Sequence, residues 1–265
     1  MGLTNSNQQL TNPLPTTAPP PFTLLVREEL ASTNDEACRL ARDGAADGLV
    51  VLAERQTSGR GRRGASWVAL AGESLAFSIV VRPAEPKSLW ARLALVAGLA
   101  VAEAVEASIP HPAGIKWPND IWIGRRKVAG ILVEASQDFA VVGIGINVNT
   151  LVFPPEVADI ATSLQLAAGQ VVDRAHVLTQ VLERLALHRR QLDAGFEEVL
   201  AGVRSRCVLS GHAVTLKTAG GPRHGTIEGL GSGGELLLRT DSGLERIIQA
   251  DDVRLDGDER SHGKT

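Results

Sequence analysis

The sequence predicts an α/β fold of the α+β type, in which a larger domain with β-α-β order is followed by a small β domain. The chain has 265 residues, 44% of them hydrophobic, so it can bury one substantial core and still supply a small appended domain. Strand-like apolar runs alternate with helical patterns as far as about Gly202. Beyond Ser210, short strands are broken by glycine, which is typical of a small antiparallel barrel or sandwich.

The elements of the larger domain follow from local signals. Residues 1 to 21 are rich in Thr, Asn, Gln and Pro, which predicts a disordered tail. Residues 32 to 36, STNDE, carry helix-start signals. In chain order we expect a strand from Phe22, a helix from 32 to 44, a strand at 49–53, a polar glycine-rich loop at 55–66, a strand at 75–81, a helix at 88–107, a hairpin at 116–134, a strand at 139–148 and a helix from Asp173 to about Gly202.

Composition and charge argue against several kinds of protein. A formal net charge of −3 gives no global field for nucleic acid or an anionic membrane, so an anion would be bound by a local cluster. Cys38 and Cys207 are too few and too far apart for a disulfide framework or a zinc site, and the six histidines lack ligand spacing. No apolar leader and no uninterrupted apolar run of about 18 residues is present, which predicts a cytoplasmic protein.

Residues 59 to 64 read GRGRRG and match the dinucleotide-binding string G-x-G-x-x-G, but their context argues against that function. A Rossmann turn needs a helix to begin within the motif, whereas Trp67 and a predicted strand follow here. Three arginines between glycines instead predict a mobile cationic loop that can fold around a phosphate. A solvated basic loop is the alternative, and nucleic-acid binding is disfavoured because only 3% of residues are aromatic.

Residues 116 to 134, KWPNDIWIGRRKVAGILVE, place polar groups where a strand-rich core would have apolar ones. After Lys116 and Asp120, a turn at Gly124 leads to Arg125, Arg126 and Lys127, and the pattern predicts a hairpin that carries three cations and a carboxylate toward one pocket. Each residue also has a purely structural interpretation, because Asn119-Asp120 after a proline is a common turn and Lys127 is a common surface residue. Asn147 stands in an apolar strand, where a buried amide must find partners.

Four segments occur in order along the chain: GRGRRGASW at 59–67, KWPNDI at 116–121, KVAGILVE at 127–134 and GIGINVN at 143–149. Together they resemble the successive motifs of the biotin protein ligases, also called biotin–[acetyl-CoA-carboxylase] ligases. The resemblance implies a mixed-sheet catalytic domain related to class II tRNA synthetases and lipoate ligases, followed by an SH3-like barrel. It also implies the monofunctional type, without an N-terminal DNA-binding domain. The expected division is a tail at 1–21, a biotin- and ATP-binding catalytic domain at 22–207, an SH3-like domain at 208–257 and a tail at 258–265.

The resemblance implies a reaction in two halves. Biotin and ATP, with Mg²⁺ held mainly through the ATP phosphates and by no protein metal site, give biotinyl-5′-AMP, and a lysine of a biotin carboxyl carrier protein then takes the biotinyl group. That carrier is expected to belong to acetyl-CoA carboxylase or a related carboxylase. The chain is expected to be a monomer or a homodimer, with no nucleic-acid or membrane partner.

Specific residues inherit roles from the resemblance. Lys127 is expected against the biotin carboxylate and the α-phosphate, while Asp120 either orients the acceptor lysine or forms a structural ion pair with Lys116 or Lys127. The apolar slot for biotin is expected along Val128, Gly130 and Leu132, with Gly143 and Gly145. The resemblance assigns catalysis to Lys127, Arg62 and Asp120; biotin binding to Ser32, Thr33, Asn34, Gln56, Gly59, Arg60, Lys127 and Gly130; and nucleotide binding to Arg60, Arg62, Arg63, Trp67, Lys116, Asn119, Lys127 and Asn147.

The chain departs from the family pattern at two places. Ala65 replaces the later arginine of the basic loop, and ADDVRL stands where a glycine-glutamate pair is common, so Asp251 and Asp252 receive no catalytic role. A lipoate-protein ligase and a noncatalytic sensor of biotin or biotinyl-AMP are the alternative functions. A dehydrogenase is least favoured, because no acidic residue follows a second strand where the ribose would be held.

Overall fold

The computed structural model of the chain describes residues 13–192 and 194–257. Residues 1–12 of the predicted first tail and all of the predicted second tail lie outside the described residues. Within the rest of the first tail, Leu14 and Ala18 are partly buried and pack against the main hydrophobic core. The chain between Pro13 and Pro21 therefore rests on the folded domain, because two of its few apolar side chains have found a partner surface.

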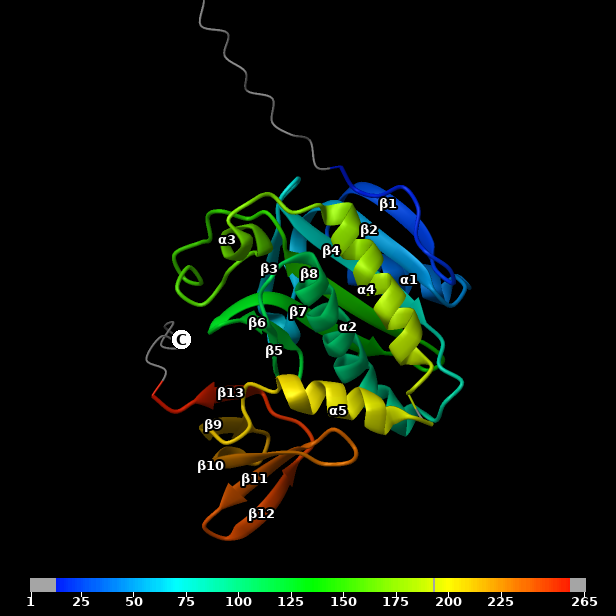
Figure 1. The fold of residues 1–265 in the computed structure, drawn as a ribbon. Helices are drawn as coiled ribbons and strands as arrows, with labels where there is room; N and C mark the ends of the chain where they lie inside the picture. Colours follow the sequence, from blue (N-terminus) through cyan, green and yellow to red (C-terminus); the bar gives the residue numbers. More distant parts are fainter. Residues whose placement is uncertain (1–12, 193, 258–265) are drawn as a thin grey trace, which may run out of the picture.

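The larger part of the molecule is built on one mixed sheet (Figure 1). Its strand order is β1-β2-β4-β8-β7-β6-β5; β1 and β2 are parallel, whereas the pairs β2-β4, β4-β8, β8-β7, β7-β6 and β6-β5 are antiparallel, and β3 pairs with β2. The strands are β1 (Thr23–Leu30), β2 (Leu49–Arg60), β3 (Ser66–Ala69), β4 (Ser74–Val81), β5 (Ala113–Lys116), β6 (Asp120–Ile123), β7 (Arg126–Ala135) and β8 (Ala140–Asn147). The mixed sheet expected from the resemblance is thus confirmed.

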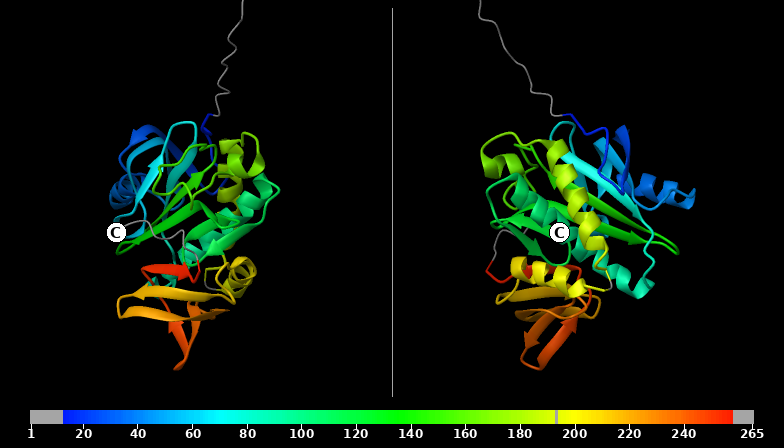
Figure 2. Two further views of the ribbon diagram at one scale, coloured as in Figure 1. Left: turned by 90° about the vertical axis from the view of Figure 1, so that its left-hand side faces the viewer. Right: turned by 45° about the vertical axis from the view of Figure 1, so that its right-hand side comes forward.

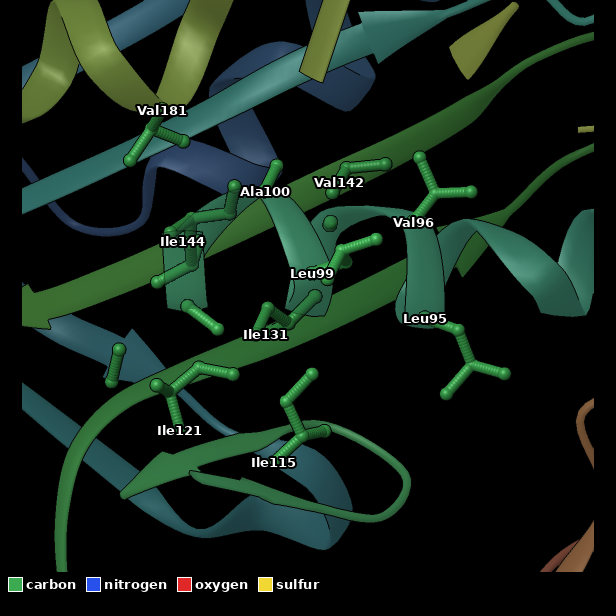
Figure 3. Packing of buried hydrophobic residues seen from close by; sticks show 14 of the residues in the cluster. Leu95, Val96, Leu99, Ala100, Ile115, Ile121, Ile131, Val142, Ile144 and Val181 are labelled. Carbon is green, nitrogen blue, oxygen red and sulfur yellow. The ribbon is translucent and has the colours of Figure 1, made fainter. Parts of the chain in front are cut away.

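Helices cover the two faces of this sheet unequally (Figure 2). One face packs against α2 and α4, where Leu95, Val96 and Leu99 of α2 lie on sheet residues such as Ile131 and Ile144 (Figure 3). On the other face, α1 packs over a smaller apolar cluster. The helices are α1 (Thr33–Arg42), α2 (Leu93–Ser108), α3 (Leu164–Ala168), α4 (Arg174–Arg189) and α5 (Phe196–Arg206), with 3₁₀ turns η1 (Arg62–Gly64) and η2 (Lys87–Arg92).

Side-chain alternation along the strands explains the two cores. In β2, Val50 and Leu52 belong to the larger core, while Val51 between them belongs to the smaller core under α1. Successive side chains of a strand point to opposite faces, so both faces of a central strand must be apolar where helices cover them. The helix α1 begins where predicted, with the Ser32 hydroxyl accepting a hydrogen bond from the Asp35 backbone N–H at 3.4 Å.

The segment Lys87–Ser108 is the described helix that is long and apolar enough to cross a membrane by length and composition. Most of it is buried inside the protein, and its α2 residues form the centre of the larger core. Its uniform hydrophobicity therefore reflects helices and strands that pack on several sides of α2.

The single helix predicted from Asp173 to about Gly202 is wrong, because the structure has two helices there. Asp173 caps α4 as expected, through hydrogen bonds from the Ala175 and His176 backbone N–H groups, but α4 ends at Arg189. Gly195 has φ of +93° and precedes α5. Glycine adopts this left-handed conformation without steric cost, so the chain turns there and α5 runs toward the C-terminal part of the molecule (Figure 1).

The loop predicted at 55–66 is also wrong in part. The strand β2 continues to Arg60, η1 forms a tip, and β3 returns antiparallel from Ser66. The basic motif is therefore the tip of a β-hairpin, and a strand follows it as the argument against a Rossmann turn required. The extension has no apolar strand pattern in the sequence, because the hairpin covers a pocket and not a close-packed core.

The C-terminal segment forms a separate antiparallel sheet with strand order β12-β11-β10-β9-β13. Its strands are β9 (Ala213–Thr218), β10 (Gly221–Leu230), β11 (Leu236–Thr240), β12 (Gly243–Ile247) and β13 (Asp252–Leu255). It contacts the larger part through the Trp117 indole N–H, which donates to the Gly234 carbonyl at 2.9 Å, and through Arg204 Nε, which donates to the Leu230 carbonyl at 3.1 Å. One buried apolar cluster includes residues of both parts, so the boundary at residue 207 stays a prediction.

A partly buried pair of His188 and Glu103 joins α2 to α4 and should make stability depend on pH. His188 Nε2 lies 2.8 Å from Glu103 Oε2, and His188 Nδ1 lies 3.3 Å from Gln191 Oε1. Burial by itself lowers the pKa of His188, but the hydrogen bonds to Glu103 and Gln191 and the Glu103 charge raise this pKa overall, with Arg184 opposing them. A raised pKa means that the stabilisation is complete below the ordinary value of about 6.5 and is lost as pH rises through the folded-state pKa.

We therefore expect His188→Gln to lower the melting temperature at pH 6 by roughly 3 to 6 °C, for a lost charged hydrogen bond of about 1.5 kcal/mol. The difference from the parent should shrink as pH rises above about 6.5, toward pH 9. Melting curves across this range check it, with the exposed His176→Gln on the same helix as the control. Parallel curves for His188→Gln and the parent would show that the imidazolium adds no stability.

Candidate active site

A cavity of about 220 Å³ opens on the face of the main sheet that α1 covers only in part. Its floor is made by β7 and β8, one wall by the first turn of α1, and its roof by the β2-β3 hairpin. Residues 250–253 of the C-terminal part close the remaining side. The cavity is lined by Ser32, Thr33, Asn34, Gln56, Arg60, Gly61, Arg62, Ala65, Ser66, Trp67, Lys116, Trp117, Pro118, Asn119, Asp120, Lys127, Gly130, Ile131, Leu132, Gly143, Ile144, Gly145, Ala250, Asp251, Asp252 and Val253.

The floor of the cavity depends on glycines in β8. A Cβ atom at Gly143 would lie 2.0 Å from Asn34 Oδ1, and one at Gly145 would lie 2.3 Å from the Trp67 ring. No side chain fits at either position without displacing these neighbours. The two glycines share a face with Val141 of the smaller core, so the strand changes from packing surface to pocket floor along its length.

A network of polar groups, neutral except for the Glu134 carboxylate, surrounds the first turn of α1. The Thr33 backbone N–H and hydroxyl donate to Gln56 Oε1 at 2.7 and 3.0 Å. The Ser78 hydroxyl lies 2.6 Å from Asn34 Oδ1 and 2.7 Å from the Thr33 hydroxyl oxygen, and Asn34 Nδ2 donates to Glu134 Oε2 at 2.7 Å. These groups are held by one another, so this end of the pocket offers oriented donors and acceptors to a neutral polar ligand.

Lys127 reaches the pocket because of a bulge in β7. The register with β6 shifts between Ile121 and Trp122, so Val128 is an extra residue and Lys127 shares a face with Gly130. In a regular strand without a bulge, two residues three positions apart would point to opposite faces of the sheet. The backbone of Lys127 is held as well, since its N–H donates to the Ile160 carbonyl at 2.7 Å.

The ammonium group of Lys127 has two neighbours in the pocket. Its Nζ lies 2.7 Å from Asp120 Oδ1 and 5.8 Å from the centre of the Trp67 ring. The sequence left two roles open for Asp120, to orient the acceptor lysine or to form a structural ion pair. The ion pair with Lys127 is present in the structure. Lys116 lines the same cavity, with its Nζ 5.0 Å from the Trp122 ring.

Arg62 points from the hairpin tip into the cavity. Its Nη1 donates to Asn119 Oδ1 at 3.1 Å and its Nη2 donates to the Ala250 carbonyl at 2.8 Å. Burial is the main cause that lowers the pKa of Arg62, and the charge of Arg63 adds to it. Both hydrogen-bond acceptors are neutral, so the half-buried positive charge would gain from an anionic ligand.

The other two arginines of the motif have acidic partners. Arg60 lines the cavity and pairs with Asp35 and, at 3.5 Å, with Glu134. Arg63 pairs with Asp251 and does not line the cavity. The three arginines therefore have different surroundings, which their shared motif did not indicate.

Four residues expected at the site do not line the cavity: Gly59, Arg63, Val128 and Asn147. Val128 is buried in the larger core instead. A Cβ at Gly59 would lie 2.3 Å from the Trp67 carbonyl oxygen, so Gly59 permits the close approach of β2 and β3. Asn147 is buried and its side-chain N–H donates to the Thr162 carbonyl at 3.1 Å, which ties β8 to the segment after it. The buried amide has found a backbone partner instead of a ligand-facing position.

Sequence reasoning missed other residues at the site. Ser78 and Glu134 complete the polar network, and their alternation in β4 and β7 was a usable signal because it places them on the face of α1. Ala250 to Val253 reach the cavity from the other sheet, and no local pattern in the sequence points to that contact.

Comparisons with known proteins agree with this site. Residues 29–150 match the model of the Biotin/lipoate A/B protein ligase family. The biotin--[acetyl-CoA-carboxylase] ligase of Paracoccus denitrificans is 36% identical over 231 residues, which cover 83% of this chain and 95% of the relative. The bifunctional ligase/repressor BirA of Bacillus subtilis is 37% identical over 238 residues, which cover 86% of this chain and 73% of the relative.

The chain belongs to the biotin protein ligases. A solved structure of the biotin protein ligase from Aquifex aeolicus in complex with biotin and ATP is similar to this chain, with a TM-score of 0.80 and 35% sequence identity. The match covers 88% of this chain and 98% of that one. The family suggested by the four sequence motifs is thus confirmed.

The close contact at Gly145 makes this ligase sensitive to a single added methyl group. We expect Gly145→Ala to displace the Trp67 ring and to destabilise the fold by about 1 to 3 kcal/mol, as overpacking does. Thermal unfolding and acrylamide quenching of tryptophan fluorescence check this, since a displaced ring becomes more accessible. Gly98→Ala in α2 is the control, because its Cβ would lie no closer than 4.0 Å to Ile121. Equal quenching of Gly145→Ala and the parent would contradict the expected displacement.

Proposed function

We propose that this chain is an ATP-dependent ligase that activates biotin as biotinyl-5′-AMP and transfers the biotinyl group to a lysine of a biotin carboxyl carrier protein. The observation that carries the proposal is the order of neutral polar, apolar and cationic groups along the cavity. Neutral donors and acceptors lie at the α1 end and glycines line the floor. Two cations complete the cavity: Lys127 beside Asp120, and Arg62 against the Ala250 carbonyl of the C-terminal part. Biotin has the same order of groups, with a neutral ureido ring, an apolar middle and a carboxylate.

The first half-reaction needs two anions held in line. The biotin carboxylate attacks the α-phosphorus of ATP, a bond to phosphorus forms, and pyrophosphate leaves with the electrons of the broken bond. Neither anion approaches the other readily unless cations offset their charges. We assign this role to Lys127 and Arg62, whose present partners, Asp120 and two neutral oxygens, can be exchanged for ligand oxygens.

Roles of the remaining lining residues follow from what they touch. Ser32, Thr33, Asn34 and Gln56 are proposed to contact the ureido ring, and Gly130, Gly143 and Gly145 to leave room for the ring and chain. Asn119, Lys116 and Trp67 are proposed on the nucleotide side with Arg62. Asp120 is proposed to hold Lys127 in place and, once a ligand takes that ammonium group, to accept a proton from the acceptor lysine.

Mg²⁺ is proposed to arrive on the phosphates of ATP. Among residues 13–192 and 194–257, no group of three or more His, Cys, Asp or Glu side chains could hold a metal ion. Asp120 is paired with Lys127, and Asp252 with Arg254 at 2.6 Å. A metal bound to ATP would supply further charge compensation at the phosphates.

The finer fold assignments rest on the same family. We propose that the five-stranded C-terminal sheet is an SH3-like barrel and that the main domain is related to class II tRNA synthetases. Antiparallel pairing through β12-β11-β10-β9-β13 supports the first proposal. A cytoplasmic location is proposed with the carrier protein, since the reaction needs both partners and ATP in one compartment.

A biotin-stimulated exchange of pyrophosphate into ATP tests the activity. We expect purified protein with Mg²⁺ to catalyse ATP–pyrophosphate exchange with biotin and not with lipoate, because the relatives named for a substrate are biotin ligases. Exchange with lipoate alone would move the chain to the lipoate branch of its family. Biotin binding without any exchange would favour the sensor function.

Lys127 is the residue whose loss should affect the chemistry most. We expect Lys127→Gln to lower biotin-stimulated exchange by about 100-fold, because a charge that follows the transition state is removed. Arg126→Gln is the control, since Arg126 is a neighbouring exposed cation on β7 that does not line the cavity. Equal losses in both variants would mean that the hairpin's general charge, and not the placement of Lys127, supports the reaction.

A further inference from the structure

We propose that Asp251 is a positioning residue: through its ion pair with Arg63, the C-terminal sheet holds the tip of the β2-β3 hairpin over the cavity and directs Arg62 into it. The inference rests on the proposed ligase function, because it names a residue that prepares the nucleotide end of that site. Asp251 itself need not touch either substrate for this role.

The hairpin tip adopts a backbone conformation that needs support. Arg63 has φ of 58° and ψ of 33°, and it is the one non-glycine residue with positive φ in the described part of the chain. A side chain disfavours this left-handed conformation, so something outside the tip has to favour it. The turn also sends consecutive side chains in different directions: Arg62 lies in the cavity, and Arg63 lies outside it against Asp251.

The acidic partner is itself fixed in the C-terminal sheet. The Asp251 backbone N–H donates to the Lys217 carbonyl of β9 at 2.6 Å, and the Asp251 side chain is 17% exposed. The preceding residue, Ala250, is buried and gives its carbonyl oxygen to Arg62. Two adjacent residues of one strand connection therefore hold two adjacent arginines of the tip. In Figure 1, β13, which follows them, lies on the side of its sheet that faces the main domain.

The contact also gives the two arginines of the tip different electrostatic surroundings. Asp251 compensates Arg63, whereas the hydrogen-bond acceptors of Arg62 in the described structure are the neutral Ala250 carbonyl and Asn119 amide. Without Asp251, the Arg63 charge would be uncompensated and free to draw the tip toward other carboxylates. The pair thus leaves Arg62 as the tip's cation that a phosphate can take.

The effect should fall on ATP and not on biotin. Arg62 lies at the Asn119 side of the cavity, away from the polar network at α1 where the ureido ring is proposed. Loss of the Asp251–Arg63 pair would therefore lower the fraction of protein in which Arg62 lies in the cavity. The apparent binding of the nucleotide would then be weaker.

The test compares Asp251→Asn, Arg63→Gly and the double variant in ATP–pyrophosphate exchange. Glycine keeps the left-handed turn at no steric cost, so Arg63→Gly removes the ion pair without removing the turn. Each single variant should raise the KM for ATP about tenfold with little change in the KM for biotin, and the double variant should be no worse than either single one. Asp251→Glu should restore much of the loss, and the exposed Asp241→Asn in the same sheet should match the parent.

Limited trypsin digestion without substrates gives a second readout that does not depend on activity. Asp251→Asn should be cleaved after Arg62 and Arg63 several times faster than the parent, at an unchanged melting temperature. Additive effects of the two single changes, or equal cleavage rates, would overturn the inference. Absence of biotin-stimulated exchange in the parent would overturn the ligase function instead, while the digestion would still decide whether Asp251 fastens the tip.

Discussion

The site depends on one constraint, which is that β7 and β8 must present an apolar face to α2 and an almost bare face to the cavity. On the α2 side, Ile131, Val142 and Ile144 complete a close-packed core. On the opposite side, Gly143 and Gly145 carry no side chain that could fill the space. A strand can meet both demands because its side chains alternate between faces. The stability of the core and the presence of the cavity therefore come from alternate residues of the same two strands.

Charge balance is the second organising feature. Several cations gather around the cavity, and like charges at such distances repel unless acidic or polar partners offset them. Asp120 performs this function for Lys127, and Asp35 with Glu134 for Arg60. These partners offset the cations in the ligand-free protein, and the lining cations can exchange them for anionic ligand groups. The arrangement fits the proposed reaction, in which negative charge enters the cavity with both substrates.

The two sheets act on one site because neither closes it alone. The main sheet supplies the floor and the polar network, while Ala250 to Val253 supply the side that contacts the hairpin tip. The short C-terminal sheet shares a buried cluster with the larger part, as a segment of its size requires. Its packing thus gives the C-terminal residues a fixed place beside Arg62.

The sequence by itself determined the features that depend on local pattern. Continuous apolar runs located the central strands, the STND segment located the start of α1, and the four ordered motifs identified the family and most of the lining residues. Only the tertiary structure decided that a bulge at Val128 turns Lys127 into the cavity, that Gly195 separates α4 from α5, and that Asn147 serves the backbone. Local pattern reports the preferences of neighbouring residues, whereas these outcomes depend on partners distant in the chain that packing alone brings together.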